Sequence, residues 1–169
     1  FNTKPIDAMA KFDNDHIIYI GSFSKLLLPS IRISYMALPH HLLPIFLQKS
    51  NGYHQTASKL EQLALAMYIE DGQLSRHLRR LRKHYRNKSE HLLKNLQQSF
   101  PHYNFVLYET ALKITMSVDE NLLDSYIRIA KENDILVNKN NNNQITLSFS
   151  GILDQDIDQA TEILEKIWL

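Results

Sequence analysis

One short stretch of the chain gathers side chains that could hold a phosphate ester and react with an aldehyde. These side chains surround a single polar turn and the start of the strand after it; they are Ser22, Ser24, Lys25 and Arg32. Serine hydroxyls donate hydrogen bonds to anions, and a guanidinium can form two parallel hydrogen bonds to a phosphate or a carboxylate. A lysine whose pKa is lowered by burial or by a neighbouring cation forms a Schiff base with an aldehyde.

The elements around this turn are predicted to be two strands. An apolar run over 16–20 ends at Gly21, and an apolar bridge with Pro29 leads to a second strand that closes at Pro39. Open α/β sheets bind ligands at the carboxyl ends of their strands, which is where this turn lies. Pyridoxal phosphate combines an aldehyde with a phosphate and would use both kinds of group. On the pattern alone, a surface turn with solvated charges is the simpler interpretation.

Composition limits the classes of protein to which the chain can belong. Its 169 residues are enough for one ordinary domain, and 44% apolar with 22% charged residues is typical of soluble globular proteins. The formal net charge of +1 indicates neither nucleic acid nor membrane as a partner. Cysteine is absent, which excludes disulfides and thiol chemistry and fits a cytoplasmic location. Phe1 is not a natural start, so we expect a piece of a longer protein.

Hydrophobic periodicity divides the rest of the sequence into a helical part and a mixed part. Helices are predicted around 6–10, over 40–50 with an interruption at Pro44, over 55–69 and over 73–99. Beyond Pro101 alternation predicts strands at about 105–107 and 112–118. The remaining elements are predicted to be a helix over 121–133, a strand at 135–137, an asparagine-rich loop over 138–144, a strand at 145–149 and a last helix capped by Asp154.

The helical periods also predict which side chains share a face. In the helix over 55–69 they are Leu60, Leu63 and Met67. The inward side chains of the last two helices are predicted to be Leu122, Leu123, Tyr126, Ile127 and Ala130, and Ile157, Ala160, Leu164, Ile167 and Trp168.

The longest predicted helix carries a basic run and three evenly spaced histidines. The basic residues are Arg76, Arg79, Arg80, Arg82, Lys83 and Arg86. An apolar stripe occupies one face of the helix, so a solvated or interface-facing set of charges is favoured over a nucleic-acid site. Metal ions need convergent ligands. His77, His84 and His91 recur every seven residues, so we expect surface histidines and no metal site.

The stretch over 20–35, IGSFSKLLLPSIRISY, resembles the cofactor-lysine segment of fold-type I aminotransferases. More particularly it resembles the aminotransferase-like domain of MocR-type regulators, GntR-family proteins that fuse a winged helix to this fold. EQLALA over 61–66 and DGQLSRHLRRLR over 71–82 extend the resemblance into the helices. It implies that Lys25 is the catalytic, Schiff-base lysine and that pyridoxal 5'-phosphate is the cofactor. The implied cofactor-binding residues are Ser22, Ser24, Lys25 and Arg32.

The resemblance implies an α/β fold that is the second half of a fold-type I aminotransferase. The implied segments are the end of the large cofactor-binding domain over 1–52, long linking helices over 53–100 and a small α+β C-terminal domain over 101–169. A homodimer is the implied assembly. The groups that contact the cofactor ring in this family would lie upstream of this sequence.

One position departs from the aminotransferase pattern. In the run over 145–149, Thr146 stands where free aminotransferases place the arginine that binds the substrate carboxylate, and a hydroxyl cannot replace that bidentate contact. The leading hypothesis is therefore the cofactor-sensing domain of a MocR-type regulator with a small-molecule effector or amino acid. DNA would be read by a winged helix absent from this sequence. A stand-alone aminotransferase, with Lys25 as proton shuttle, and a non-binding interaction module are the alternatives.

The isolated 169 residues would contain only part of such a cofactor site. We therefore expect weak binding of pyridoxal phosphate, or none, because an exposed ion pair contributes about 0–1 kcal/mol. The strands around Lys25 are expected to be disordered or to pair with a second copy.

Overall fold

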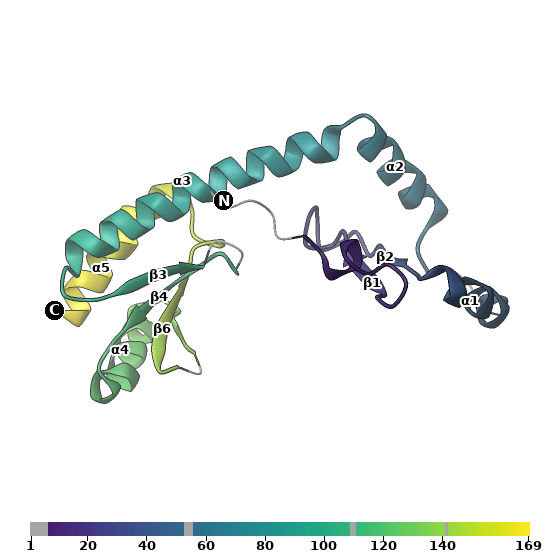
Figure 1. Cartoon of the computed structure of the whole chain (residues 1–169). Coiled ribbons are helices and arrows are strands. Elements are labelled where there is room, and N and C mark those ends of the chain that lie inside the picture. The colour runs from purple at the N-terminus through teal and green to yellow at the C-terminus, as the bar shows by residue number, and fades with distance from the viewer. Residues whose placement is uncertain (1–6, 53–55, 109–110, 141) are drawn as a thin grey trace. The chain divides into compact units, whose positions relative to one another are not determined.

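The computed structural model describes residues 7–52, 56–108, 111–140 and 142–169 (Figure 1). They fall into two compact units, an N-terminal unit that extends to Arg79 and a C-terminal unit that begins at Arg80. The boundary lies within helix α3 (Gln73–Ser99), so this helix contributes residues to both units. The expected division into segments 1–52, 53–100 and 101–169 stays a prediction.

The N-terminal unit consists of one hairpin and helices. Its elements are η1 (Met9–Lys11), β1 (Tyr19–Ser22), β2 (Ser34–Ala37), η2 (His40–Leu42), α1 (Leu43–Ser50), α2 (Lys59–Glu70) and the start of α3. Pro44 lies in the first turn of α1 and does not interrupt it, because proline's missing N–H has no intrahelical partner there anyway. Strands β1 and β2 pair with each other as an antiparallel hairpin, so the expected disorder around Lys25 is wrong, whereas the alternative of pairing with a second copy stays a prediction.

Few apolar side chains of the N-terminal unit are buried. Among its described residues, the large apolar side chains that are buried are Ile33 and Leu65. The predicted face of α2 is exposed instead, with Leu60 at 76% and Leu63 at 61%, while Leu65 packs inward. Periodicity thus identified an amphipathic helix but not the face that this chain covers.

The C-terminal unit is built on a four-stranded antiparallel sheet in the order β3-β4-β6-β5. Its strands are β3 (Phe105–Tyr108), β4 (Lys113–Ser117), β5 (Asn138–Lys139) and β6 (Gln144–Ser148). Its helices are the rest of α3, α4 (Glu120–Glu132), η4 (Asp154–Asp156) and α5 (Ile157–Trp168). The prediction for 73–99 agrees with α3 at both ends, and the strands predicted at 105–107, 112–118 and 145–149 and the helix predicted over 121–133 are confirmed within one residue.

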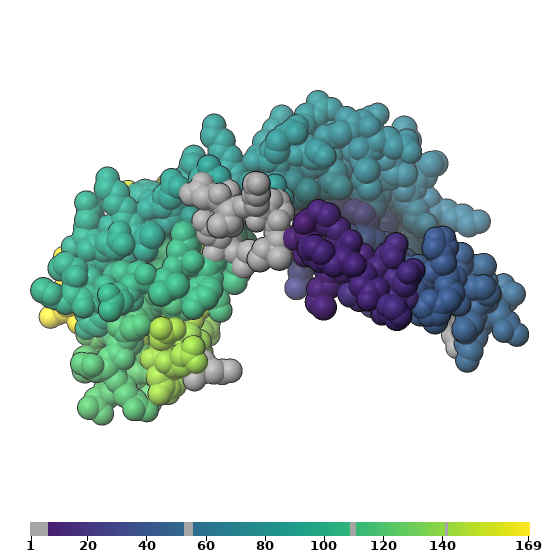
Figure 2. Space-filling model, viewed as in Figure 1, coloured from purple at the N-terminus to yellow at the C-terminus, as the bar shows by residue number. Residues whose placement is uncertain are grey.

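The core of this unit lies between the sheet and its helices. Alternate residues of the two central strands, Ile114 and Met116 in β4 and Ile145 and Leu147 in β6, point into it. The helices contribute the buried side chains of Leu92, Leu96, Leu123, Ala130, Ile157 and Leu164. Figure 2 shows this unit, coloured from teal through green to yellow, as one closely packed body. The predicted inward residues of α4 and α5 are confirmed except for Leu122, which is exposed.

Tyr126 of α4 and Trp168 of α5 fasten these two helices to each other. The Tyr126 hydroxyl donates to the Trp168 carbonyl at 2.9 Å, and the Trp168 indole Nε1 donates to the Tyr126 carbonyl at 3.0 Å. Their rings stack with centroids 5.1 Å apart. Burial first, and the hydroxyl of Tyr103 second, raise the pKa of Tyr126 to about 12.

Two boundary predictions in this unit are wrong. The strand expected at 135–137 is β5 (Asn138–Lys139), because the Ile135 amide still closes α4 by donating to the Ala130 carbonyl, after Asp134 at φ 60°. Asp154 does not cap α5 with a side-chain hydrogen bond. Its carboxylate lies 3.3 Å from the amine of the buried Lys88, which also donates to the Ile152 carbonyl.

Candidate functional site

The hairpin places the predicted site residues at one end of its two strands. Ser22 is the last residue of β1 and is paired with Ser34, the first residue of β2. The Phe23 amide donates to the Ile33 carbonyl at 3.0 Å and closes the loop between the strands. Lys25 lies in a helical turn after β1, and Arg32 comes two residues before β2. The turn therefore follows the carboxyl end of a strand, as predicted, in an antiparallel pair.

Side-chain hydrogen bonds fix this turn. Ser22 Oγ accepts a hydrogen bond from the Ser24 amide at 3.3 Å, an arrangement that commonly stabilises turns. The Ser24 hydroxyl donates to the carbonyl of Ile31 across the loop. The proton of Ser24 is thus committed to the backbone, whereas that of Ser22 can still be donated.

An open depression of about 540 Å³ lies over the turn, and we call it the polar depression. Its lining residues are Ser22, Ser24, Lys25, Leu27, Pro29, Arg32 and Ser34. The structure therefore brings all four sequence-predicted residues together, and their roles in binding stay predictions. Ser34 was missed. The signal for it was its place in β2 opposite Ser22, which needs the register of the hairpin.

Tyr35 packs over the hairpin next to the polar depression. Its ring contacts those of Phe23 and Tyr19, with centroids 5.3 Å and 6.0 Å away. It also covers Gly21 on the opposite strand, where an added Cβ would collide with the tip of the ring. A hydrogen bond with Tyr19, and secondly burial, raise the pKa of Tyr35 above its usual value. These contacts hold the strand ends that carry Ser22 and Ser34.

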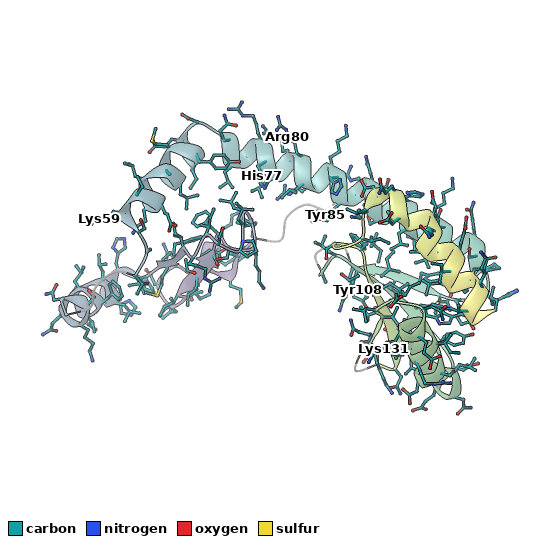
Figure 3. All side chains as sticks on the ribbon, turned by 180° about the vertical axis from the view of Figure 1, so that it is seen from behind. Lys59, His77, Arg80, Tyr85, Tyr108 and Lys131 are labelled. Carbon is teal, nitrogen blue, oxygen red and sulfur yellow. The ribbon has the colours of Figure 1, made fainter. Side chains whose placement is uncertain are left out.

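A second cavity of about 510 Å³, the apolar pocket, lies in the same unit. It is lined by Leu27, Leu28, Ile31, Glu61, Ala64, Leu65, Tyr68 and His77, so Leu27 is common to both cavities. His77, labelled near the start of α3 in Figure 3, is not the surface histidine that its spacing predicted. Its Nε2 is buried and has no hydrogen-bond partner among the residues that the structure describes.

The other two histidines of α3 pair with aspartates near α5. His91 Nε2 lies 2.7 Å from Asp158, and His84 Nδ1 lies 3.6 Å from Asp154. A hydrogen bond from Asn95 first, and His91 second, hold the pKa of Asp158 below its usual value. Within the described ranges, no three histidine, aspartate or glutamate side chains gather closely enough to hold a metal ion.

The remaining sequence features lie on exposed or structural positions. The basic side chains Arg76, Arg79, Arg80, Arg82 and Lys83 are exposed on α3, as predicted, whereas that of Arg86 is half-buried. Thr146 lies in the middle of β6, directly opposite Thr115 of β4. Its hydroxyl is buried, with no hydrogen-bond partner in the part of the chain that is described. None of the helices in the described ranges is long and apolar enough to span a bilayer.

Comparison with known proteins found curated regulators that are similar in sequence and solved aminotransferase structures that are similar in fold. No model of a known protein family matches the chain. It is 30% identical over 183 aligned positions to the uncharacterized HTH-type transcriptional regulator YdeL of Bacillus subtilis, a match that covers 99% of this chain and 39% of that protein. It is 35% identical over 91 residues to MocR of Rhizobium meliloti, a probable rhizopine catabolism regulatory protein, covering 53% of this chain and 18% of that protein.

Solved structures show the fold. LysN, an α-aminoadipate aminotransferase of Thermus thermophilus complexed with N-(5'-phosphopyridoxyl)-L-leucine, matches with a TM-score of 0.73 at 21% identity, covering 95% of this chain and 44% of that chain. The chain thus has the fold of part of a fold-type I aminotransferase, as predicted. Two curated regulators match nearly the whole of this chain, and the chain spans about two-fifths of the length of each of them.

Proposed function

We propose that this chain, which is similar along its whole length to HTH-type transcriptional regulators and over half of it to MocR, is the effector-binding part of such a regulator, with pyridoxal 5'-phosphate as its cofactor. The observation that carries the proposal is the polar depression, where one amine, one guanidinium and two serine hydroxyls with uncommitted protons line a single cavity. When bound, pyridoxal phosphate supplies an aldehyde and an electron-withdrawing ring.

The residues of the polar depression fit the two reactive ends of this cofactor. The exposed guanidinium of Arg32 can form two parallel hydrogen bonds to phosphate oxygens, and Ser22 can donate a third. Lys25 is the lysine that lines the depression and would bond to the aldehyde carbon. The hydroxyl of Ser24 donates to the Ile31 carbonyl, so we assign it the role of holding the turn.

A sensory role is favoured over amino-acid transamination by Thr146. A hydroxyl in the middle of β6 cannot make the bidentate contact by which an arginine binds a carboxylate. A regulator needs the lysine bond and the phosphate contacts but no such arginine. DNA would be bound through a separate HTH domain, as the names of the relatives suggest, and the working form would be a homodimer.

The lysine assignment is tested in the full-length protein that contains this chain. We expect Lys25→Ala to abolish the visible absorbance of lysine-bound pyridoxal phosphate, whereas the matched variant Lys49→Ala, on the exposed surface of α1, retains it. Borohydride reduction followed by peptide mass spectrometry should place the label on Lys25. A label on any other lysine would contradict the proposal.

The phosphate contact has a separate test. Arg32→Ala should weaken pyridoxal phosphate binding about tenfold or more, since a hydrogen bond to a charged group contributes about 1.5–3 kcal/mol. Arg32→Lys should restore only part of the affinity because an ammonium cannot form the two parallel bonds. Arg79→Ala, which removes an exposed arginine of α3, is the matched control. Turnover of amino acids by the wild-type protein would instead support the alternative of an aminotransferase.

A further inference from the structure

Ser34 lies directly opposite Ser22 in the hairpin, so its side chain projects from the same face of the two strands. The two residues form the last pair of the β1–β2 register, immediately beside the loop that holds Lys25 and Arg32. Directly opposite residues of an antiparallel pair project from the same face, with Cβ atoms about 4.5–5.5 Å apart. Both side chains are exposed, and both line the polar depression.

The hydrogen bonds of the turn distinguish the three serines of the depression. Ser24 gives its proton to the Ile31 carbonyl, and Ser22 uses only an oxygen lone pair to accept the Ser24 amide. The Ser34 hydroxyl has no hydrogen-bond partner among the described residues. Ser22 and Ser34 therefore present two adjacent hydroxyl donors on one face, and the guanidinium of Arg32 lines the same cavity.

We infer that Ser34 is a further ligand of the phosphate group, acting as a pair with Ser22. This inference rests on the proposed binding of pyridoxal phosphate and makes it more specific. Two serines whose Cβ atoms lie about 5 Å apart can each donate a hydrogen bond to a different oxygen of one tetrahedral phosphate, and Arg32 would donate two parallel hydrogen bonds to the same group. Ser34 thus favours phosphorylated aldehydes over their unphosphorylated counterparts and contributes nothing to the bond with Lys25.

The test compares pyridoxal phosphate with pyridoxal, which lacks the phosphate, as probes of the full-length protein. Ser34→Ala should weaken binding of pyridoxal phosphate about tenfold, the effect of one hydrogen bond to a charged group, and leave the affinity for pyridoxal unchanged. Ser34→Thr keeps the hydroxyl and should retain most of the affinity. Ser30→Ala, in the same loop but outside the lining of the depression, should change neither. Circular dichroism checks that each variant is folded.

The outcomes separate this inference from the proposed function. Suppose that Lys25→Ala abolishes the visible absorbance of lysine-bound pyridoxal phosphate and Arg32→Ala weakens binding, while Ser34→Ala has no effect. The proposed cofactor site is then supported, and the role inferred for Ser34 is wrong. Equal losses for pyridoxal phosphate and pyridoxal in Ser34→Ala would mean that Ser34 only shapes the turn, which also overturns the inference. A wild-type protein that binds no pyridoxal phosphate would overturn both.

Discussion

The two units of this chain differ in how they use their apolar residues. In the C-terminal unit, side chains from a four-stranded sheet and three helices meet in one buried cluster. In the N-terminal unit, large apolar side chains of β1, α1 and α2 are exposed, including Ile20, Phe46 and Leu60. All residues of the candidate site belong to the N-terminal unit, in which few apolar side chains are buried.

The residues that contribute most to stability and the residues of the candidate site therefore lie in different units. Burial of apolar area contributes roughly 25 cal/mol per Å², so most of the hydrophobic stabilisation of the chain comes from the C-terminal unit. The hairpin that carries Lys25 depends more on its own loop hydrogen bonds and on the rings around Tyr35. Stability and ligand binding can therefore be changed independently by mutation.

The largest expected effect contrasts two leucines on helices, one from each unit. Leu96→Ala in α3 should lower the free energy of unfolding of the C-terminal unit by about 2–5 kcal/mol, because Leu96 is fully buried. Leu60→Ala in α2 should change the free energy of unfolding of the N-terminal unit by less than about 0.5 kcal/mol, because Leu60 is exposed. During urea denaturation the fluorescence of the single tryptophan, Trp168, reports unfolding of the C-terminal unit, and circular dichroism reports the helices of both units. A large cost for Leu60→Ala would show that the exposed face of α2 is covered in solution.

A smaller effect is expected at the contact between α4 and α5. Tyr126→Phe removes the donor to the Trp168 carbonyl and should cost about 1 kcal/mol. Because the folded-state pKa of Tyr126 is raised to about 12 from 10, its contribution is complete below pH 10 and is lost as the pH rises toward 12. Denaturation across this pH range should show the loss in the wild type and a weaker one in Tyr126→Phe. Tyr108→Phe, an exposed tyrosine of β3, should behave as the wild type.

The smallest effect compares one aspartate–histidine pair from each unit. A side-chain hydrogen bond with His16 lowers the pKa of Asp13, and one from Asn95 lowers that of Asp158. Each stabilises the fold above its unfolded pKa, and this contribution is lost as the pH falls through the folded value. Carboxyl NMR titration should show that urea restores the ordinary pKa of Asp158. The pKa of Asp13 should stay partly lowered, because His16 is only three residues away. Equal behaviour of the two would contradict this.

Helices and strands with strong local signals were predictable from the sequence. Helix α3 lies between Gly72, at φ 70°, and Pro101. Both residue types restrict or free the backbone by their own covalent structure, so their effect can be predicted without knowledge of the rest of the fold. The alternation in β4 and β6 identified their buried faces correctly. The strand expected at 135–137 failed because Ile135 closes the preceding helix, a choice between two backbone hydrogen-bond partners that no side-chain pattern records.

The candidate site was predictable to the extent that it is local. Ser22, Ser24, Lys25 and Arg32 lie within eleven residues, so one turn brings them together whatever the rest of the fold does. Ser34 could be found only from the strand register, and the burial of His77 Nε2 only from the apolar pocket formed with α2 and the loop after Lys25. Pairings between distant residues are set by packing, which the sequence pattern does not reveal.

The ring of Tyr35 over Gly21 has a consequence for how such chains can diverge. Aromatic side chains compensate for glycine on a neighbouring strand by covering the bare backbone. Any side chain at position 21 would displace the tip of the ring. Substitutions at 21 and 35 should therefore be inherited together: a larger residue at 21 is tolerated only in lineages where position 35 has lost its aromatic ring. Covariation of these two positions among relatives would therefore show that the contact between the Tyr35 ring and the bare backbone of Gly21 has constrained both residues.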